Sequence, residues 1–316
     1  MKHIIKLKGG LGNQMFQYAF GCALMHKFLQ QPKQHSTQQS PKKYPQKQHP
    51  EILFDNSWFN ETGKMGADGE RKNGITIRKF VLDIFNLDID FADEKTLKKI
   101  KTGFKIPKFL RKKFPALKYL NTCINEDNPF KYEEKLLNVK KNHHFEGYFQ
   151  NEKYFKNCAD IIKKDFTFKN IEDPQNKALS EKIQNTKNSV FIHIRRGDYL
   201  DIGNMALNLE YYKNAIKIIK EKIKDPVFFV FAKGADDYIK NEFNIGEDFE
   251  FIKAKGPDYI DMQLMSQCEN GIIANSSFSW WAAWLIDKKD KIIIAPSPWL
   301  NGFDDIICDS WIKLKR

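Results

Sequence analysis

The second half of the chain alternates short apolar runs with amphipathic stretches, a pattern typical of a parallel sheet covered by helices. The apolar runs predict buried strands at 190–194, 227–232, 249–252, 271–274 and 291–295. The stretches between them predict helices at about 208–224, 236–243, 258–268 and 277–287. This alternation favours a doubly wound, Rossmann-like α/β domain.

The first half opens in the same way, with a strand at 3–7, a glycine turn and an apolar helix running through Leu24. Further strands are expected at 51–55 and 145–150, and a helix at about 151–164. A chain of 316 residues exceeds the size at which one hydrophobic core keeps growing. The polar stretch 169–188 therefore predicts a boundary between domains at 1–185 and 186–316.

The amino-acid composition indicates a folded globular protein but does not identify its ligand. The 26 Phe and 6 Trp supply ample core material. The net charge of +12 fits nucleic acid, an anionic membrane face or an anionic small substrate equally well. Residues 30–50 are rich in Gln, Lys, Pro, Ser and His without an acid, which predicts a surface insertion.

The cysteines and the apolar segments predict the cellular setting. The 5 cysteines are widely spaced without a Cys-x-x-Cys pair, so neither a disulfide framework nor a zinc site is expected. No apolar run reaches the roughly 18–20 residues that span a bilayer, and no signal-peptide pattern stands at the start. A cytoplasmic protein is the expectation.

A basic amphipathic region covers residues 95–118, which contain ten Lys or Arg residues and no acid. Two interpretations are open. The region is either a solvated helix face or a peripheral contact with the anionic inner-membrane surface.

The most informative segment runs from a buried strand into Arg195, Arg196, Gly197 and Asp198. Ligands of open α/β sheets bind beyond the carboxyl ends of such strands. A guanidinium matches two phosphate oxygens at once, so paired arginines here indicate a phosphorylated ligand. A salt bridge between arginine and aspartate at the strand end is the structural alternative.

Two further turns carry candidate ligand contacts. Gly10 and Gly12 lie in a strand–turn–helix segment, where backbone amides can approach an anion or a sugar hydroxyl, or simply form a tight turn. Asn275, Ser276 and Ser277 follow the strand at 271–274, where a serine can cap the next helix or contact a phosphate. The tryptophans that follow are expected to fill the core.

Together these segments resemble the bacterial α-1,2-fucosyltransferases of glycosyltransferase family 11. Three motifs carry the resemblance. The first is Gly9-Gly10-Leu11-Gly12-Asn13-Gln14-Met15-Phe16-Gln17-Tyr18-Ala19, and the second is His193-x-Arg195-Arg196-Gly197-Asp198-Tyr199. The third runs from Asp261-Met262-Gln263-Leu264-Met265-Ser266 through Ile272-Ile273-Ala274-Asn275-Ser276-Ser277-Phe278-Ser279-Trp280-Trp281. The resemblance implies a GT-B fold with two Rossmann-like domains facing a cleft. It also implies GDP-β-L-fucose as donor substrate and inverting transfer to the 2-hydroxyl of a terminal galactoside, without a metal or cofactor.

The resemblance further implies roles for individual residues. Arg195 would hold the β-phosphate of the leaving GDP, with Arg196 beside it, in a donor-binding C-terminal domain. Guanine contacts would come from His193 and Asp261, and phosphate contacts from Asn275, Ser276 and Ser277. Gly10 and Gly12 would line the donor site. Asp198 is the nearest candidate for the general base, or else it orients Arg196. Asn13 could instead position the acceptor or the sugar, and the transfer could also proceed without a strong base.

Other functions stay open at this point. Another nucleotide sugar could be the donor, or the fold could bind sugar without catalysis. A nucleic-acid-binding protein would account for the charge, although no recognition module is present. The acceptor could be lactose, N-acetyllactosamine, a Galβ1-3GalNAc unit or a lipid-linked O-antigen repeat, because acceptor pockets are built from loops.

Overall fold

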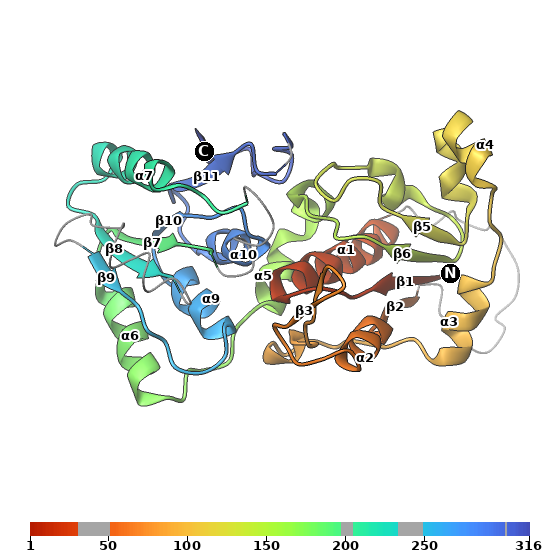
Figure 1. Ribbon diagram of the computed structural model, residues 1–316, viewed down its shortest axis with the longest axis horizontal. Helices are drawn as coiled ribbons and strands as arrows, with labels where there is room; N and C mark the ends of the chain where they lie inside the picture. Colours follow the sequence, from red (N-terminus) through yellow and green to blue (C-terminus); the bar gives the residue numbers. More distant parts are fainter. Residues whose placement is uncertain (31–50, 197–204, 233–248, 301) are drawn as a thin grey trace, which may run out of the picture. The chain divides into compact units, whose positions relative to one another are not determined.

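The computed structural model describes residues 1–30, 51–196, 205–232, 249–300 and 302–316. It divides into two compact units, Met1–Thr167 and Phe168–Arg316, both shown in Figure 1. Each unit is built on a parallel sheet with helices, so the expected α/β fold of the GT-B type with two Rossmann-like units is confirmed. The predicted helix at 236–243 and nearly all of the insertion at 30–50 lie outside the described residues.

The first unit holds a four-stranded parallel sheet in the order β2-β1-β6-β5. Its strands are β1 Lys2–Lys6, β2 Glu51–Asp55, β5 Cys123–Asn125 and β6 His143–Glu146, with a hairpin of β3 Arg71–Lys72 and β4 Ile75–Thr76. Its α-helices are α1 Leu11–Leu29, α2 Ser57–Gly63, α3 Glu94–Lys101, α4 Lys108–Lys113 and α5 Ala159–Asp165. Its 3-10 helices are η1 Leu82–Ile84, η2 Pro115–Leu120, η3 Glu134–Asn138, η4 Glu152–Tyr154 and η5 Lys156–Cys158.

The core of the first unit forms between α1 and the sheet. Ile4 and Ile5 of β1 are fully buried, as the apolar run predicted. Phe16 and Phe20 of α1 are also fully buried, and Phe20 stacks on Phe149 with ring centroids 4.0 Å apart. Because α1 starts directly after β1, this packing fixes the glycine turn between them.

The second unit holds a six-stranded parallel sheet in the order β12-β11-β10-β7-β8-β9. Its strands are β7 Ser189–His193, β8 Val227–Phe231, β9 Phe249–Phe251, β10 Asn270–Ile272, β11 Ile293–Ser297 and β12 Ile312–Lys315. Its helices are α6 Pro174–Asn185, α7 Leu209–Lys222, α9 Tyr259–Ser266 and α10 Ser277–Leu285. Helix α7 lies on one side of the sheet, and α6 and α9 lie on the other (Figure 1).

This strand order is that of a dinucleotide-type Rossmann fold, because the strands read 6-5-4-1-2-3 when numbered within the unit. The order reverses between β7 and β10, which pair directly with Ile192 opposite Ile272. The crevice beyond the carboxyl ends of these two strands is where such sheets bind ligands.

Local sequence accounts for the elements around this crevice. All five residues of β7 are buried, as expected for a central parallel strand. Helix α7 begins where the Asn208 side chain accepts a hydrogen bond from the Tyr211 amide at 2.9 Å. The tryptophans of α10 are core residues, as predicted, because Trp280 and Trp281 are fully buried.

The boundary between the units lies between Thr167 and Phe168, whereas the sequence placed it after residue 185. The difference is helix α6. Its Asn176 side chain exchanges two 2.9 Å hydrogen bonds with the Lys255 backbone, and Ser180 Oγ donates to Gln267 at 2.8 Å. These side-chain contacts make α6 part of the second unit, although its polar composition resembles a linker.

Three other segments differ from the sequence-based expectation. The helix expected at 151–164 begins only at Ala159, after η4 and η5. Strand β6 ends at Glu146, and the next residues form a turn in which Phe149 has a φ of 52°. The basic region 95–118 is not one amphipathic helix but α3, α4 and η2, separated by the breaks at 102–107 and Phe114.

Candidate active site

Two of the predicted motifs leave adjacent strands at the reversal point of the second sheet. Strand β7 ends at His193, and half-buried Arg195 and Arg196 follow it. Strand β10 ends at Ile272, and buried Asn275 and Ser276 follow it. Since β7 and β10 pair in parallel, the arginines and the Asn-Ser segment emerge from the same edge of the sheet.

His193 is a buried, neutral histidine at this edge. Burial, and secondarily the positive charge of Arg195, lowers the pKa of His193 to about 3. Its ring lies beside Phe278, with centroids 5.8 Å apart, and Tyr212 Oη donates to its backbone carbonyl at 3.3 Å. The imidazole is therefore buried and carries no charge at neutral pH.

Ser276, one of the two adjacent serines that could cap the helix by sequence, is the N-cap of helix α10. Its Oγ accepts a hydrogen bond from the Phe278 amide at 3.3 Å. The Asn275 side chain donates to the Met205 carbonyl at 3.0 Å, and Ser279 Oγ donates to the carbonyl of Ala274 at 3.3 Å. The first turn of α10 thus lies at the positive end of the helix, and the hydroxyls of Ser276 and Ser279 are engaged in hydrogen bonds within the turn.

Asp261 lies in the first turn of helix α9 and is half-buried. Helices α9 and α10 pack against each other. Helix α9 follows β9 and α10 follows β10, so both helices start at the carboxyl edge of the sheet. The structure thereby brings together at one edge a group of predicted site residues: His193, Arg195, Arg196, Asp261, Asn275, Ser276 and Ser277. Asp198 lies outside the described residues.

The glycine motif lies in the other unit, at the corresponding point of the first sheet. Strand β1 lies between β2 and β6, so the chain order also reverses beside β1. Gly9 takes a φ of 78°, Gly10 is the residue before α1, and Gly12 and Asn13 lie in the first turn of that helix. Gly10, Gly12 and Asn13 therefore form a second group, on a different unit from the arginines.

Two buried glutamines of α1 hold this turn. Gln14 Nε2 donates to the carbonyls of Gly9 at 2.9 Å and Lys79 at 2.8 Å. Gln17 Oε1 accepts from the Lys8 amide at 2.9 Å, while its Nε2 donates to the Gly147 carbonyl at 3.0 Å. Gln17 thus joins the turns that follow β1 and β6.

The turn after β6 brings Gln150 to the predicted site. Gln150 Nε2 donates to Asn13 Oδ1 at 2.7 Å. The turn itself is held by Glu126, whose carboxylate accepts from the amides of Tyr148 at 2.6 Å and Phe149 at 3.0 Å. These contacts fix Asn13 through a residue 137 positions away in the chain.

Two carboxylates near this turn have opposite electrostatic settings. Burial raises the pKa of Glu126 to about 7, although the Tyr148 and Phe149 amides act in the other direction. Burial acts to raise the pKa of Glu146, but the charges of Lys6 and Lys8 outweigh it and lower this pKa. The Nζ atoms of both lysines lie 3.3 Å from Glu146 Oε1. Lys8 Nζ also lies 4.9 Å from the centre of the Tyr148 ring.

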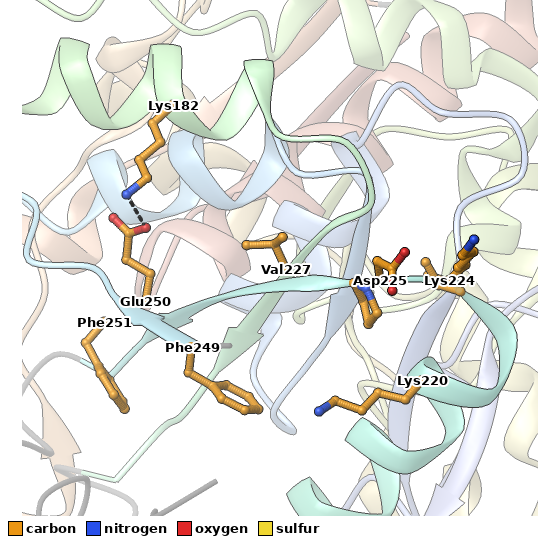
Figure 2. A pocket seen from close by; sticks show the side chains of 10 residues that line it. Lys182, Lys220, Lys224, Asp225, Val227, Phe249, Glu250 and Phe251 are labelled. Atoms are coloured by element: carbon orange, nitrogen blue, oxygen red, sulfur yellow. Dashed lines mark ion pairs between the residues drawn. The ribbon is translucent and has the colours of Figure 1, made fainter. Parts of the chain in front are cut away.

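Figure 2 shows an open pocket of about 940 Å³ elsewhere on the second unit. It lies where β8 begins, at Val227, and therefore at the opposite end of that strand from the carboxyl edge. Lys182 of α6 pairs there with Glu250 of β9 at 2.5 Å, and Lys220 lies 5.9 Å from the Phe249 ring. None of the predicted site residues lines this pocket.

Metal-binding clusters and membrane-spanning helices are absent from the described residues. Within those residues, no group of three or more His, Cys, Asp or Glu side chains could hold a metal ion. No helix in the same part of the chain has the length and apolar character needed to cross a membrane. The five cysteines form no disulfide with one another.

Comparison with known proteins assigns the family. The family model described as glycosyl transferase family 11 matches residues 1–311, almost the whole chain. The chain belongs to glycosyltransferase family 11. The match spans both units, so the glycine motif and the arginine motif fall within one family-wide pattern, and the family predicted from these motifs is confirmed.

Curated relatives of this family 11 chain include an alpha-1,2-colitosyltransferase of Escherichia coli, 33% identical over 99% of both chains. The O-antigen biosynthesis glycosyltransferase WbnK of Escherichia coli is 29% identical, over 98% of this chain and 99% of its own. Among solved structures, NodZ alpha-1,6-fucosyltransferase soaked with GDP-fucose is 12% identical with a TM-score of 0.43, covering 90% of this chain and 92% of its own. The family model and the two curated relatives support a glycosyltransferase activity.

Sequence reasoning did not single out several residues that shape the family 11 site. Gln14 and Gln17 stand inside the glycine motif, and their burial in an otherwise apolar helix face was a usable signal. Gln150 ends the Phe-Glu-Gly-Tyr-Phe-Gln segment, and its position just beyond the carboxyl end of β6 was informative. Glu126 gave no local signal, because β5 is only three residues long and was not predicted.

Proposed function

We propose that this family 11 chain transfers L-fucose from GDP-β-L-fucose to the 2-hydroxyl of a terminal β-galactoside, with inversion and without a metal ion. The observation that supports the proposal most is the gathering of the arginine motif and the Asn-Ser-Ser segment at the strand-order reversal of the second unit. These residues suit a phosphorylated ligand, and membership of glycosyltransferase family 11 indicates that the ligand is a sugar donor.

A second donor sugar, colitose, is the alternative to fucose. A relative at 33% identity is named alpha-1,2-colitosyltransferase. Colitose is L-fucose without its 3-hydroxyl group, so one crevice could accept either sugar while differing in a single hydrogen-bonding group. The acceptor proposed is a glycan of the O-antigen type, in line with the name of the WbnK relative.

The proposed reaction is a single displacement at the anomeric carbon. The acceptor 2-hydroxyl oxygen forms a bond to C1 of fucose, the bond from C1 to the β-phosphate oxygen breaks, and GDP leaves with the electron pair. Negative charge grows on the diphosphate as that bond breaks. Arg195, with Arg196 beside it, stabilises this charge more in the transition state than in the ground state, which is what accelerates the reaction.

Other residues of the second unit bind the nucleotide in this proposal. A carboxylate in the first turn of α9, Asp261, accepts hydrogen bonds from the two neighbouring N–H groups of guanine. His193 contacts the base as a neutral imidazole because its pKa is lowered to about 3. Asn275, Ser276 and Ser277 bind the phosphates at the positive end of α10.

The first unit orients the sugars in this proposal. The glycine turn at Gly10 and Gly12 lets the donor approach the backbone, and Asn13 positions the acceptor. The hydrogen bond from Gln150 leaves Asn13 with one defined orientation. Asp198 is the proposed acceptor of the proton released from the 2-hydroxyl.

The decisive experiment measures GDP release from GDP-fucose with and without lactose, in the presence of EDTA, for wild type and Arg195→Ala. We expect acceptor-dependent release that survives EDTA and falls on the order of 10²–10³ in the variant. Arg71→Ala is the matched control, because Arg71 is an exposed arginine in the β3–β4 hairpin. This control should keep wild-type activity.

The same assay separates the alternatives. Release from GDP-colitose at a higher kcat/KM than from GDP-fucose would move the donor assignment to colitose. Donor binding without release would leave GDP-fucose in place and point to another acceptor. If neither GDP-sugar binds, or if Arg195→Ala is as active as wild type, the proposed reaction is wrong.

A further inference from the structure

Among the described residues, the three most exposed phenylalanines lie in one short segment of the first unit. The exposed fractions are 70% for Phe109, 64% for Phe104 and 52% for Phe114. Leu120, which ends the same segment, is 47% exposed. Large apolar side chains scattered singly over a surface need no explanation, but a group of this kind marks an interaction site.

The same segment carries exposed positive charge. Lys105, Lys108, Lys112 and Lys113 are all exposed and alternate with the phenylalanines. Residues 104–120 contain no Asp or Glu. We call this combination of exposed aromatic and lysine side chains the 104–120 surface.

The structure separates this surface from the rest of the basic region 95–118. Leu97 and Ile100 of α3 pack into a core cluster with Ile4 and Leu53, so α3 is an ordinary surface helix. Lys101 is bound to buried Asp55 at 2.8 Å and serves the fold.

Lys118 is likewise excluded from the surface by its contacts. It is buried and forms ion pairs with Asp127 and with Glu133, the latter at 2.7 Å. The remaining lysines of residues 104–120 are the exposed ones. They are therefore available to a partner, whereas the lysines that stabilise the fold are occupied.

The backbone presents these residues away from the core of the first unit. Helix α4 packs mainly on η2, the next turn of the chain, and none of its six residues is buried. Figure 1 shows α4 projecting beyond the sheet of its own unit. Such a projecting element can enter an interface without disturbing the fold that carries it.

We propose that the 104–120 surface docks the protein on an anionic lipid bilayer. Aromatic side chains insert at the level of the lipid head groups, and lysines attract anionic phosphates beside them. Nucleic acid would use the lysines but leave three exposed phenylalanines in water, and an acidic protein partner would need its own apolar patch in register. An anionic lipid surface can accept the aromatic rings and pair with the lysine charges at the same time. The proposed contact is peripheral.

The test is sedimentation of the full chain with vesicles made of equal amounts of phosphatidylcholine and phosphatidylglycerol, compared with phosphatidylcholine alone. No donor or acceptor is added, so failure here and failure of the transfer reaction are separate results. We expect binding to the anionic vesicles that weakens as salt rises, and little binding to the neutral ones.

Two variants dissect the surface. The triple change Phe104→Ser, Phe109→Ser and Phe114→Ser should lower vesicle affinity by at least tenfold, because each ring loses its burial in the head-group region. The quadruple change Lys105→Gln, Lys108→Gln, Lys112→Gln and Lys113→Gln should lower affinity by about fivefold per lysine. Both variants should melt like wild type, because these side chains are exposed.

Matched controls come from elsewhere in the same unit. The change Lys95→Gln, Lys98→Gln and Lys99→Gln removes exposed lysines of α3, and Leu29→Ser removes an exposed leucine at the end of α1. Each should reduce vesicle binding much less than the 104–120 variants. Equal loss in the controls, no vesicle binding, or binding to duplex DNA in preference to vesicles would each overturn the proposal.

Discussion

At the scale of single residues, Glu126 shows how a partly buried carboxylate can shape a site that it does not enter. Phe149 takes a φ of 52°, a left-handed conformation that is costly for a bulky side chain. The Glu126 carboxylate accepts from the Phe149 amide, and Phe20 stacks on the Phe149 ring, so the turn is held from two sides. The strained turn then aims Gln150 at Asn13.

This setting predicts an unusual pH dependence. The pKa of Glu126 is about 7 in the fold against an ordinary 4.5, so the folded state binds the proton more tightly than the unfolded state. Stability should therefore fall as pH rises from about 4.5 to about 7, by at most about 3 kcal/mol. Glu126→Gln keeps an oxygen acceptor and removes the titration, so its urea-unfolding free energy should vary less over this pH range than that of wild type.

Glu146 provides a control, because its pKa is shifted in the opposite direction from that of Glu126. Its pKa is lowered because Lys6 and Lys8 lie beside it, so its contribution is present above the ordinary carboxyl pKa and lost as pH falls. Glu146→Gln should destabilise the protein at neutral pH and have little effect in acid. If both variants changed the pH profile in the same direction, the assigned settings would be wrong.

At the scale of elements, the β1–α1 turn depends on one glycine more than on its neighbours. Gly9 has a φ of 78°, and a Cβ added there would lie 2.6 Å from Asn13 Nδ2. Gly10 lacks both constraints, because a Cβ would meet only Arg78 Nε at 3.9 Å. The backbone conformation of the turn therefore requires a glycine at position 9, whereas position 10 has open space that a side chain could occupy.

We accordingly predict different results for three glycine variants. Gly9→Ala should cost about 1–2 kcal/mol of stability and also lower transferase activity, because it displaces Asn13. Gly74→Ala, at a φ of 76° with no atom within 4 Å of its Cβ, should cost similar stability and leave activity unchanged. Gly10→Ala should melt like wild type, and its activity should fall if a ligand approaches that backbone. Thermal melting and GDP release distinguish these outcomes.

At the scale of the whole molecule, the chain consists of two units whose boundary precedes helix α6. Besides its hydrogen bonds, α6 contributes Ile183, which is 1% exposed, and the ion pair from Lys182 to Glu250. Its Gln175 side chain also donates to the Lys253 carbonyl at 2.9 Å. These contacts reach β9 itself, the segment that follows β9, and the C-cap residue of α9.

Fragments test this boundary directly. We expect residues 168–316 to give a cooperative thermal transition by circular dichroism. Residues 186–316 should fail to do so, because removal of α6 exposes apolar surface and leaves buried polar groups without partners. A cooperative transition of the shorter fragment would return the boundary to residue 185.

The sequence by itself determined the elements whose signals are local. Strand β2 falls at the predicted residues, and β7 differs from prediction by one position, because a short apolar run between polar turns is sufficient to identify a buried strand. The cap at Ser276 was predictable because a hydroxyl that precedes a helix satisfies amides only two or three residues away. The family motifs were readable for the same reason, since each is continuous in the chain.

Tertiary structure alone decided which of these segments meet. The strand order places the arginine motif beside the Asn-Ser-Ser segment, because β7 pairs with β10 across about 80 residues of chain. Packing likewise assigned α6 to the second unit, joined Gln150 to Asn13, and buried Ile100 while leaving Phe109 exposed. Such contacts depend on free energies gained between distant residues, which a local hydrophobic pattern does not contain.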